Sequence, residues 1–499
     1  MRVLVVGGGS AGWITAAYLN ASLNTPTQQN ALIGLIESET IGRIGVGEAT
    51  IPTIKRTLAR IGMREVDFMK ATDATFKQAI RFDNWAEENH RYYHPFDRLT
   101  ALNFDYRGLR WLGSNRSVKY ADTVTPQTKF CEEGLGPKNG SYPDYQGAIA
   151  YAYHLDAERF ADALRDFSKP RGVQHMVDDV VEVEQKENGD IAAIKTKSGQ
   201  RYEADLFIDC TGFARILIGK TLGVDFETVS DYLLCDRAVA MRVPYDVKPV
   251  KAIRPYTTAT AVGSGWIWDI GLRDRRGTGY VYSSDFLSDD DAEAELRAFE
   301  GPHCKDIPAR RLRFATGKIK TPWVKNCIAI GLSAGFLEPL ESTGIFFAEE
   351  GVDYLAELFP RLGEMDKARE IYNQRMGQRY EEAIDFINLH YVLSKRRDTP
   401  FWREASADHR MTPRIKEYLA RWEQKPPSRL DFVDQIQLFS HINYEFILYG
   451  MDWTPEKLRS PPPQVGAPDV SRIAKIAVDM RKNMKPHNVL LKEIAAAKR

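Results

Sequence analysis

Apolar and polar residues follow one another along the N-terminal part of the chain in the order expected of strands and helices. Residues 3–6 (VLVV) are four consecutive apolar residues, which is typical of a short buried strand. Residues 7–12 fit the pattern G-x-G-x-x-G and open a helical pattern over 14–19. A second apolar run, 32–36, ends on Glu37. This order predicts a βαβ unit whose first turn is rich in glycine.

The glycine-rich turn is the first candidate for a binding site. Glycines in such a turn let the backbone fold tightly and approach a pyrophosphate, while the helix N-terminus offers free N–H groups. A carboxylate at the end of the second strand, here Glu37, is placed to accept the ribose hydroxyls of an adenine dinucleotide. An ordinary βα turn is the alternative, because the motif alone is weak, but the second strand and its carboxylate favour a nucleotide site. The predicted cofactor contacts in the turn are Gly7, Gly9, Ser10, Ala11 and Gly12.

Periodicity along the rest of the chain predicts a mixed α/β protein. A second glycine-rich segment, 41–52, is expected to lie against the cofactor, with Thr50 capping a helix. The aromatic-rich stretch 92–151 does not fit an α/β repeat and is interpreted as an insertion. The other expected elements are helices over 54–71 and 154–171, a strand over 74–85, a hairpin of strands 177–183 and 191–197, strands over 205–213 and 327–331, a β-rich lobe over 226–320, a helix through 347–355 capped by Ser342 or Thr343, and a long amphipathic helix over 371–391.

Two stretches place reactive or flat side chains on expected strands. In 74–85, Lys77 falls opposite the apolar positions, so this stretch alone favours a solvated lysine. In the β-rich lobe, Trp266 and Trp268 are separated by one residue, so both would point to the same side of a strand. They would face a flat partner or a core, and core packing is the default interpretation for the pair.

Length and composition narrow the class of protein. A chain of 499 residues predicts two lobes, and the equal numbers of basic and acidic residues, 68 each, give no sign of nucleic acid or an anionic membrane as a partner. The five cysteines contain no C-x-x-C pair, which suits a reducing cytoplasm, and no metal site is expected. No apolar run approaches the roughly 18 residues of a membrane helix, so a soluble cytoplasmic protein is expected.

Six motifs together resemble those of flavin-dependent halogenases of the tryptophan halogenase type. They are residues 7–13, 47–52 (GEATIP), 76–77 (FK), 93–96 (YHPF), 266–270 (WIWDI) and 335–344 (GFLEPLESTG). The resemblance spans most of residues 1–405. It is specific, because unrelated flavin proteins share the first motif but not the lysine, the tryptophan pair and the ESTG segment together.

The resemblance implies a fold and a cofactor. The fold is α/β, with a Rossmann-like FAD-binding domain of the flavin monooxygenase type over residues 1–365. Inserted segments at about 86–150 and 226–320 would form a β-rich substrate lobe, and residues 366–499 a mainly helical C-terminal subdomain that covers the substrate. Beside the first turn and Glu37, the implied FAD contacts are Gly47, Glu48, Ala49 and Leu332.

The resemblance also implies a reaction. Reduced FAD from a separate reductase reacts with O2 to a flavin hydroperoxide, and chloride or bromide held by the backbone of Thr343 and Gly344 attacks it to give hypohalous acid. Lys77 then hydrogen-bonds this acid or becomes a haloamine, while Glu341 stabilises the cationic ring intermediate and takes its proton as general base. The tryptophan pair shields the flavin from the organic substrate. The residues implied to line the substrate are His94, Phe96, Trp266 and Trp268.

Two departures from the family pattern bear on the site. Gly271 stands where the family usually has a proline, which removes a fixed φ and is expected to loosen the local turn. Tryptophan-specific members grip the amino-acid end of tryptophan with a cluster of adjacent tyrosines, a carboxylate and a Phe-Trp pair, and no such cluster is evident in the segment 428–451. A more open pocket is therefore expected, for an electron-rich aromatic such as an indole, phenol or pyrrole.

Two other functions stay open at this point. An aromatic hydroxylase would use the same flavin chemistry directly on the substrate, and would need neither the halide site nor Lys77. A non-enzymatic carrier built on the flavin fold would have no reason to hold Lys77 or the segment 341–344. The expected partners of a halogenase are a flavin reductase and a small aromatic molecule, and a monomer or homodimer is expected.

Overall fold

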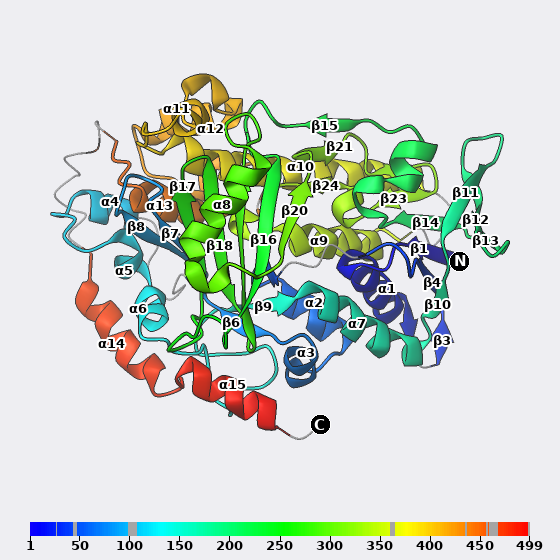
Figure 1. Cartoon of the computed structure of the whole chain (residues 1–499), viewed down its shortest axis with the longest axis horizontal. Helices are drawn as coiled ribbons and strands as arrows, with labels where there is room; N and C mark the ends of the chain where they lie inside the picture. Colours follow the sequence, from blue (N-terminus) through cyan, green and yellow to red (C-terminus); the bar gives the residue numbers. More distant parts are fainter. Residues whose placement is uncertain are drawn as a thin grey trace. The chain divides into compact units, whose positions relative to one another are not determined.

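The computed structural model describes residues 1–25, 27–42, 47–97, 107–359, 365–434, 437–455, 458 and 468–497 (Figure 1). The chain divides into two compact units, and each is assembled from three separate stretches. The first unit comprises Met1–Ala74, Leu155–Thr228 and Phe314–Tyr380, and the second comprises Thr75–His154, Val229–Arg313 and Glu381–Arg499. The predicted division into a FAD-binding domain with inserted segments and a C-terminal subdomain stays a prediction about function.

The first unit is built on a six-stranded sheet in the order β10-β4-β1-β14-β23-β22. Its strands are β1 (Arg2–Val6), β4 (Leu32–Glu37), β10 (Gln174–Val177), β14 (Leu206–Asp209), β22 (Trp323–Val324) and β23 (Cys327–Ala329). All pairings are parallel except that of β22 with β23. Helix α1 (Ser10–Leu23) follows β1 and packs against α7 (Ala157–Ser168) and α9 (Gly344–Glu357). The predicted βαβ unit at the N-terminus is therefore confirmed.

Two expected helices of the first unit differ from their prediction. The pattern over 54–71 forms two helices, α2 (Ile54–Ile61) and α3 (Glu65–Ala71), because Gly62 ends the first with φ +79°. Thr50 does not cap α2, whose N-cap is Thr53. The pattern over 154–171 begins as a strand, β9 (Ala152–Asp156), which pairs with β6 (Thr75–Lys77), and only then becomes α7. The hairpin is confirmed as β11 (Val180–Gln185) and β12 (Ile191–Thr196).

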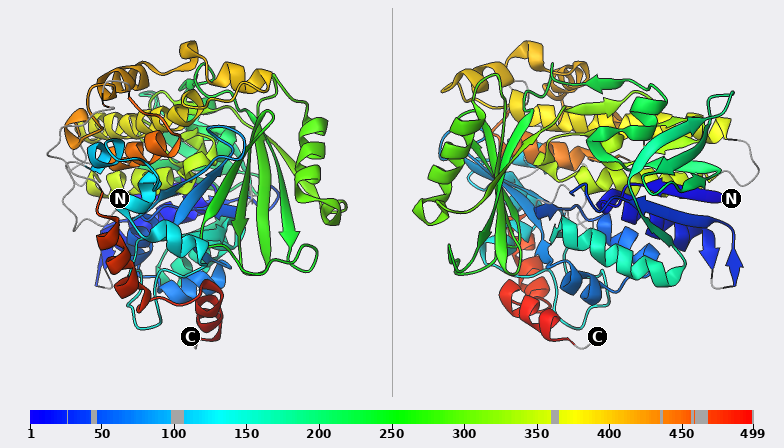
Figure 2. Two further views of the ribbon diagram at one scale, coloured as in Figure 1. Left: turned by 90° about the vertical axis from the view of Figure 1, so that its left-hand side faces the viewer. Right: turned by 45° about the vertical axis from the view of Figure 1, so that its right-hand side comes forward.

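The second unit is built on a seven-stranded sheet in the order β20-β16-β19-β18-β17-β7-β8. Its strands are β7 (Ala79–Asp83), β8 (Arg91–Pro95), β16 (Arg237–Pro244), β17 (Thr257–Val262), β18 (Gly265–Gly271), β19 (Arg275–Tyr282) and β20 (Ala309–Arg313). Helix α8 (Asp289–Glu300) lies along one face, as both views of Figure 2 show. Ala292 and Leu296 of this helix share a core with Val239, Ile267 and Tyr280. The face covered by α8 is therefore the one that carries Ile267, and Trp266 and Trp268 lie on the other.

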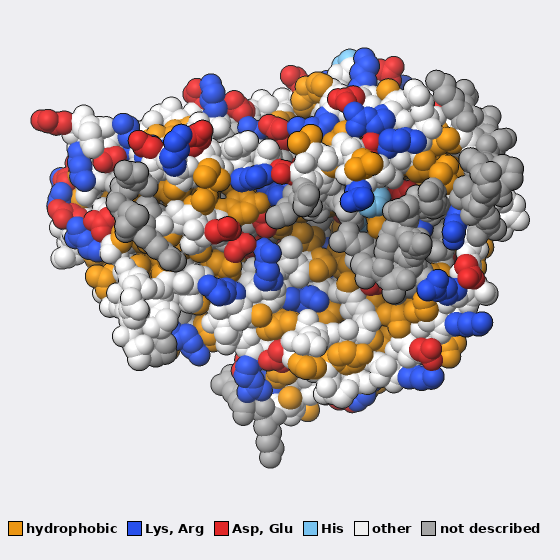
Figure 3. Space-filling view, turned by 180° about the vertical axis from the view of Figure 1, so that it is seen from behind, with side chains coloured by type: hydrophobic (Ala, Val, Ile, Leu, Met, Phe, Trp, Pro, Cys, Tyr) orange, Lys and Arg blue, Asp and Glu red, His pale blue; other side chains and the backbone are white. Residues whose placement is uncertain are grey.

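Helices dominate the C-terminal part. They are α10 (Asp366–Val392), α11 (Pro400–Ala405), α12 (Pro413–Trp422), α13 (His441–Gly450), α14 (Val470–Arg481) and α15 (His487–Ala496). The long amphipathic helix is confirmed as α10, except that Ile371, expected on its apolar face, is 44% exposed. None of the helices over the described residues has both the length and the apolar character needed to span a bilayer. On the surface seen in Figure 3, acidic and basic side chains are interspersed, in line with their equal numbers.

Candidate functional site

The turn after β1 has the shape of a nucleotide cradle. A Cβ atom at Gly12 would lie 1.9 Å from the carbonyl oxygen of Gly7, and one at Gly7 would lie 2.2 Å from that of Cys210, so the backbone packs here without room for side chains. At Gly9, the N-cap of α1, a Cβ would meet nothing within 4 Å. No side chain caps this helix start. Open space beside a helix N-terminus with free N–H groups fits a pyrophosphate.

Glu37 lies against the same turn. A Cβ at Gly8 would lie 1.8 Å from Glu37 Oε2, so only glycine allows the carboxylate to approach the backbone this closely. His175, on the neighbouring strand β10, lies with its Nε2 2.9 Å from Glu37 Oε1. The carboxylate is therefore held in a fixed position at the end of β4, as the prediction of a ribose contact requires.

The turn of residues 331–333 completes this corner of the first unit. A Cβ at Gly331, whose φ is +77°, would lie 2.4 Å from the Cβ of Ala11. The turn that carries Leu332 thus packs directly on the first turn of α1. The donors and the shape present at this corner fit the adenine dinucleotide part of FAD.

The segment 47–52 is predicted to contact FAD, and the structure describes its fold but does not test that contact. Gly47–Ala49 forms the short strand β5, and burial raises the pKa of Glu48 to about 7. Residues 43–46 of the second glycine-rich segment lie outside the described residues. A FAD contact by Gly47, Glu48 and Ala49 stays a prediction.

The ESTG segment forms a tight corner at the start of α9. Glu341 ends a 3-10 turn, Ser342 has φ +62°, and α9 begins at Gly344 with Thr343 as N-cap. The predicted capping position is confirmed, but the Thr343 side chain makes no capping hydrogen bond. Its hydroxyl is buried and has no hydrogen-bond partner within the part of the chain that the structure describes. A Cβ at Gly344 would meet nothing within 4 Å, so the helix start borders open space.

Lys77 ends strand β6 in the second unit. The expected single strand over 74–85 is divided at Gln78, whose N–H donates to the carbonyl oxygen of Pro255 at 2.8 Å. Lys77 is 0% exposed, so the interpretation as a solvated lysine is wrong. Its Nζ lies 5.0 Å from the centre of the Phe96 ring, because the N–H of Phe96 donates to the carbonyl oxygen of Gln78 at 3.1 Å. The structure thus brings a predicted catalytic residue and a predicted substrate contact together.

Two buried histidines near Lys77 were missed by sequence analysis. His487 of α15 accepts the Phe76 N–H at Nε2 (3.2 Å), and its Nδ1 lies 2.9 Å from the carbonyl oxygen of Ile253. His154 of β9 lies with Nε2 2.9 Å from the hydroxyl of Thr257. Burial lowers the pKa of His487 to about 4, and burial together with the charge of Lys77 holds the pKa of His154 well below its usual range. Neither histidine stands in a local motif, so no sequence signal pointed to them.

His94 lies among aromatic rings that sequence analysis did not single out. Its Nε2 lies 2.8 Å from the amide nitrogen of Asn443, and its ring centre lies 5.6 Å from that of Phe386 and 5.9 Å from that of Phe446. Phe386 in turn stacks on Phe439 with 3.8 Å between ring centres. Phe439, Asn443 and Phe446 belong to the segment 428–451, which shows no tryptophan-gripping cluster in its sequence. The expectation of a more open pocket stays a prediction.

The tryptophan pair lies on β18 as the alternation predicts. The ring centres of Trp266 and Trp268 are 6.4 Å apart, and both side chains are buried. The Trp268 ring lies over Gly279 of β19, where a Cβ would come within 2.1 Å of it. The loosened turn expected at Gly271 is not found. Gly271 is a buried strand residue paired with Arg276, and a Cβ there would lie 2.8 Å from Ile253.

Comparisons with known proteins agree with this geometry. The sequence profile of the family described as tryptophan halogenase matches residues 2–463. The chain belongs to the tryptophan halogenase family. It is 37% identical over 471 residues to the tryptophan 6-halogenase SttH of Streptomyces toxytricini, which covers 90% of this chain and 89% of the relative.

Solved structures support the same assignment. The tryptophan halogenase of Shewanella frigidimarina NCIMB 400 superposes with a TM-score of 0.91 at 34% identity, covering 99% of this chain and 97% of that one. A flavin-dependent halogenase from Xanthomonas campestris superposes with a TM-score of 0.89 at 32% identity, covering 100% and 99%. The predicted α/β fold with a Rossmann-like FAD-binding part is confirmed, and the protein is an enzyme of the flavin-dependent halogenase class. The roles of the individual site residues stay predictions.

Proposed function

We propose that this enzyme halogenates an electron-rich aromatic such as an indole, using chloride or bromide, O2 and FADH2 from a separate flavin reductase. The observation that carries the proposal is the complete burial of Lys77 beside the ring of Phe96, in a chain of the halogenase family. A lysine that binds no cofactor or substrate is seldom excluded from water, because its charge is costly to desolvate. A reactive role explains why this position holds an amine.

FAD would be held by the cradle of the first unit. The backbone at Gly9, Ser10 and Ala11 would receive the pyrophosphate, and Glu37 the ribose hydroxyls. When bound in reduced form, the cofactor supplies with O2 the two-electron oxidation that converts a halide ion and a proton into hypohalous acid, with water as the other product. Leu332 would lie beside it, since its turn packs on Ala11.

The halide would bind at the start of α9. Two observations support the backbone at Thr343 and Gly344 in this role: the buried Thr343 hydroxyl has no partner among the described residues, and the helix N-terminus borders open space. The positive end of the helix dipole favours an anion at this place. Chloride and bromide both meet these requirements.

Lys77 would deliver the halogen to the ring. As an ammonium it donates a hydrogen bond to hypohalous acid, and as an amine it exchanges a proton for the halogen and releases water. In either case the aromatic carbon gains the halogen and loses a proton. Glu341, which is 2% exposed, is proposed as the base that accepts this proton and stabilises the cationic ring. Phe96 and His94 would contact the substrate, and the tryptophan pair would separate it from the flavin.

The test is substitution of Lys77 with a matched control. Lys77→Ala should fold, bind FAD and consume reduced flavin, yet lower halogenated product by at least roughly 10²-fold in a mass-spectrometric assay with indole, a reductase, NADH and either halide. Lys138→Ala is the control, because Lys138 is also buried and lies 5.4 Å from the centre of a ring, that of Tyr151. Product retained in Lys77→Ala would exclude the proposed role. An oxygenated product formed without halide would identify a hydroxylase instead.

The substrate class is tested in the same assay. We expect indole to be turned over more efficiently than tryptophan, because segment 428–451 shows no cluster like the one that grips the amino-acid end of tryptophan in tryptophan-specific members. Equal concentrations of both compounds in one reaction give the ratio of the two kcat/KM values directly. A ratio in favour of tryptophan would contradict this choice and leave the halogenase assignment intact.

A further inference from the structure

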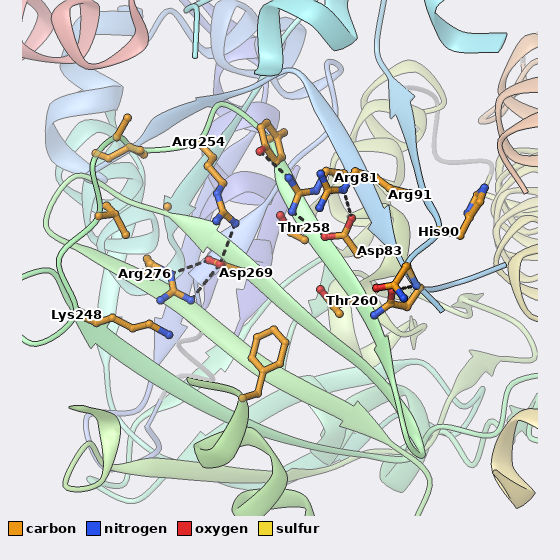
Figure 4. Close-up of a pocket in the computed structure, with 18 of the residues that line it drawn as sticks. Arg81, Asp83, His90, Arg91, Lys248, Arg254, Thr258, Thr260, Asp269 and Arg276 are labelled. Carbon is orange, nitrogen blue, oxygen red and sulfur yellow. Dashed lines mark hydrogen bonds and ion pairs between the residues drawn. The ribbon is translucent and has the colours of Figure 1, made fainter. Parts of the chain in front are cut away.

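A polar groove lies on the α8 face of the seven-stranded sheet, opposite the face that carries the tryptophan pair. It encloses about 690 Å³, and all residues that line it belong to the second unit. Figure 4 shows side chains of β7, β17, β18 and β19 converging on it. Phe299 of α8 and Tyr245 also line it. Neither the proposed halogenation nor any residue assigned to it uses this groove.

Two buried hydrogen-bond donors in the groove have no partner among the described residues. The hydroxyl of Thr258, a residue 4% exposed, and the Nε of Arg81, a residue 9% exposed, make no hydrogen bond to any residue that the structure describes. Thr258 and Arg81 are opposite one another in the parallel pairing of β17 with β7, so their side chains share one face. A buried polar group without a partner costs free energy, and a bound ligand removes that cost.

The rest of the Arg81 guanidinium is held by its neighbours. Nη1 donates to the hydroxyl of Tyr256 at 3.0 Å, and Nη2 donates to Asp83 at 2.7 Å. Arg91 also donates to Asp83, at 2.8 Å. Since these contacts fix the group, its Nε and the Thr258 hydroxyl form a preorganised pair of donors.

Positive charge exceeds negative charge around the groove. The cationic side chains that line it are Arg81, Arg91, Lys119, Lys248, Arg254 and Arg276. They are offset by Asp83 and Asp269, which also line the groove, and by Glu300, which accepts hydrogen bonds from Arg276 and Lys248. Arg254 is the least engaged of the arginines beside Asp269, with 3.6 Å to that carboxylate and a side chain 52% exposed. The groove therefore suits a ligand with more than one negative charge.

We propose that this groove binds the phosphate ester of a small organic molecule. The phosphate would accept from Thr258 and Arg81 and pair with Arg254, and its two charges would meet the positive excess. The volume falls in the range of organic-ligand pockets, about 300–1,000 Å³, and exceeds the needs of a bare phosphate ion. Phe299, 44% exposed, offers an apolar wall for the organic part. This inference is independent of the halogenation chemistry.

Calorimetric titration with phenyl phosphate tests the proposal, at constant ionic strength and with the full-length protein. Thr258→Val removes the hydroxyl at nearly constant shape, and Arg254→Gln removes the exposed charge; each should weaken binding by roughly tenfold. Arg313→Gln is the matched control, because Arg313 is also exposed and paired with one aspartate but does not line the groove. It should bind phenyl phosphate as the wild type does, and thermal melting should show that all three variants fold.

Three outcomes would overturn the proposal. The first is no binding of phenyl phosphate at millimolar concentration. The second is equal binding of phenylacetate with the same sensitivity to Thr258→Val, which would assign the site to carboxylates. The third is equal binding of inorganic phosphate, which would reduce the groove to a simple ion site. None of them depends on flavin or on product formation, so failure here is distinguishable from failure of the proposed halogenation.

Discussion

Two buried histidines, His154 and His487, lie beside strand β6, which ends on Lys77, and both are uncharged near neutral pH. Phe96 presents its ring to Lys77, and the two histidines are neutral because burial depresses the pKa of both. His487 keeps one donor and one acceptor role, toward Ile253 and Phe76 respectively. These fixed roles hold strand β6, which ends on Lys77, against α15 at any pH where the imidazole stays neutral.

This arrangement predicts a specific acid sensitivity. The pKa of His487 is about 4 in the folded chain and about 6.5 in the unfolded chain, so only the unfolded chain gains a proton between these values. The contribution of neutral His487 to the stability of the folded chain is therefore complete above pH 6.5 and is lost as the pH falls toward 4. Between pH 7 and pH 5, we expect the free energy of unfolding to fall by about 2 kcal/mol because of this group.

Urea unfolding at the two pH values measures the effect. His487→Gln keeps a donor and an acceptor but cannot titrate, so the loss between pH 7 and pH 5 should shrink by about that amount. His409→Gln is a suitable control, because the side chain of His409 is 65% exposed. An unchanged loss in His487→Gln would contradict the assignment.

The sequence did not predict which individual polar side chains are buried. From residues 74–85 alone, Lys77 is expected in solvent because it falls on the strand face opposite the apolar positions. Its burial depends on pairing with β9, which lies about 75 residues further along the chain, and on the segment of Phe96, whose N–H bonds to the carbonyl oxygen of Gln78. Thr258 and Arg81 likewise meet only through a parallel pairing between strands more than 170 residues apart in number, and no local pattern encodes that pairing.

At the scale of elements, the pairing of β18 with β19 sets the position of Trp268, because Gly279 of β19 lies directly under its ring. Gly279 leaves the space that the Trp268 ring fills, and Ala at this position would place a Cβ 2.1 Å from that ring. We expect Gly279→Ala to destabilise the fold by about 1–3 kcal/mol and to change the tryptophan fluorescence, because the ring must move.

Gly263→Ala is the matched control for this substitution. Gly263 lies beside the same strand, and a Cβ there would meet only the Glu295 carboxylate, at 3.7 Å or more. The melting temperature and the tryptophan fluorescence of Gly263→Ala should match those of the wild type. If Gly279→Ala melts and fluoresces as the control does, the strand tolerates a shift that the structure does not suggest.

Elements with strong local signals were predicted well, and those shaped by distant pairing were not. The turn after β1 and the hairpin of β11 and β12 follow from apolar runs and glycine turns within a few residues. By contrast, β9 carries the start of a helical pattern but is extended, because it pairs with β6. The division of 54–71 could have been found, since Gly62 followed by a polar stretch is a stop signal.

For the molecule as a whole, binding of FAD should appear as a gain in stability. A ligand that binds only the folded chain adds about 2.7 kcal/mol at a concentration 100 times its Kd, which should raise the melting temperature by a few degrees. Gly9→Val should abolish most of this shift without lowering the stability of the FAD-free protein, because a side chain at Gly9 enters open space.

Gly377→Ala serves as the control, since Gly377 lies in α10 and a Cβ there also meets nothing within 4 Å. Both variants add a side chain where the glycine has open space around it, one inside the nucleotide cradle and one outside it. A full FAD-induced shift in Gly9→Val would mean that the pyrophosphate lies elsewhere.

The order of the two units along the chain limits how this enzyme can be shortened or recombined. The chain passes from one unit to the other after residues 74, 154, 228, 313 and 380, and the last passage falls within the continuous helix α10. No single cut yields a fragment that contains one whole unit and none of the other. Exchange of the second unit between relatives therefore requires grafting its three stretches at once, and a library that varies one crossover point will yield mostly incomplete cores.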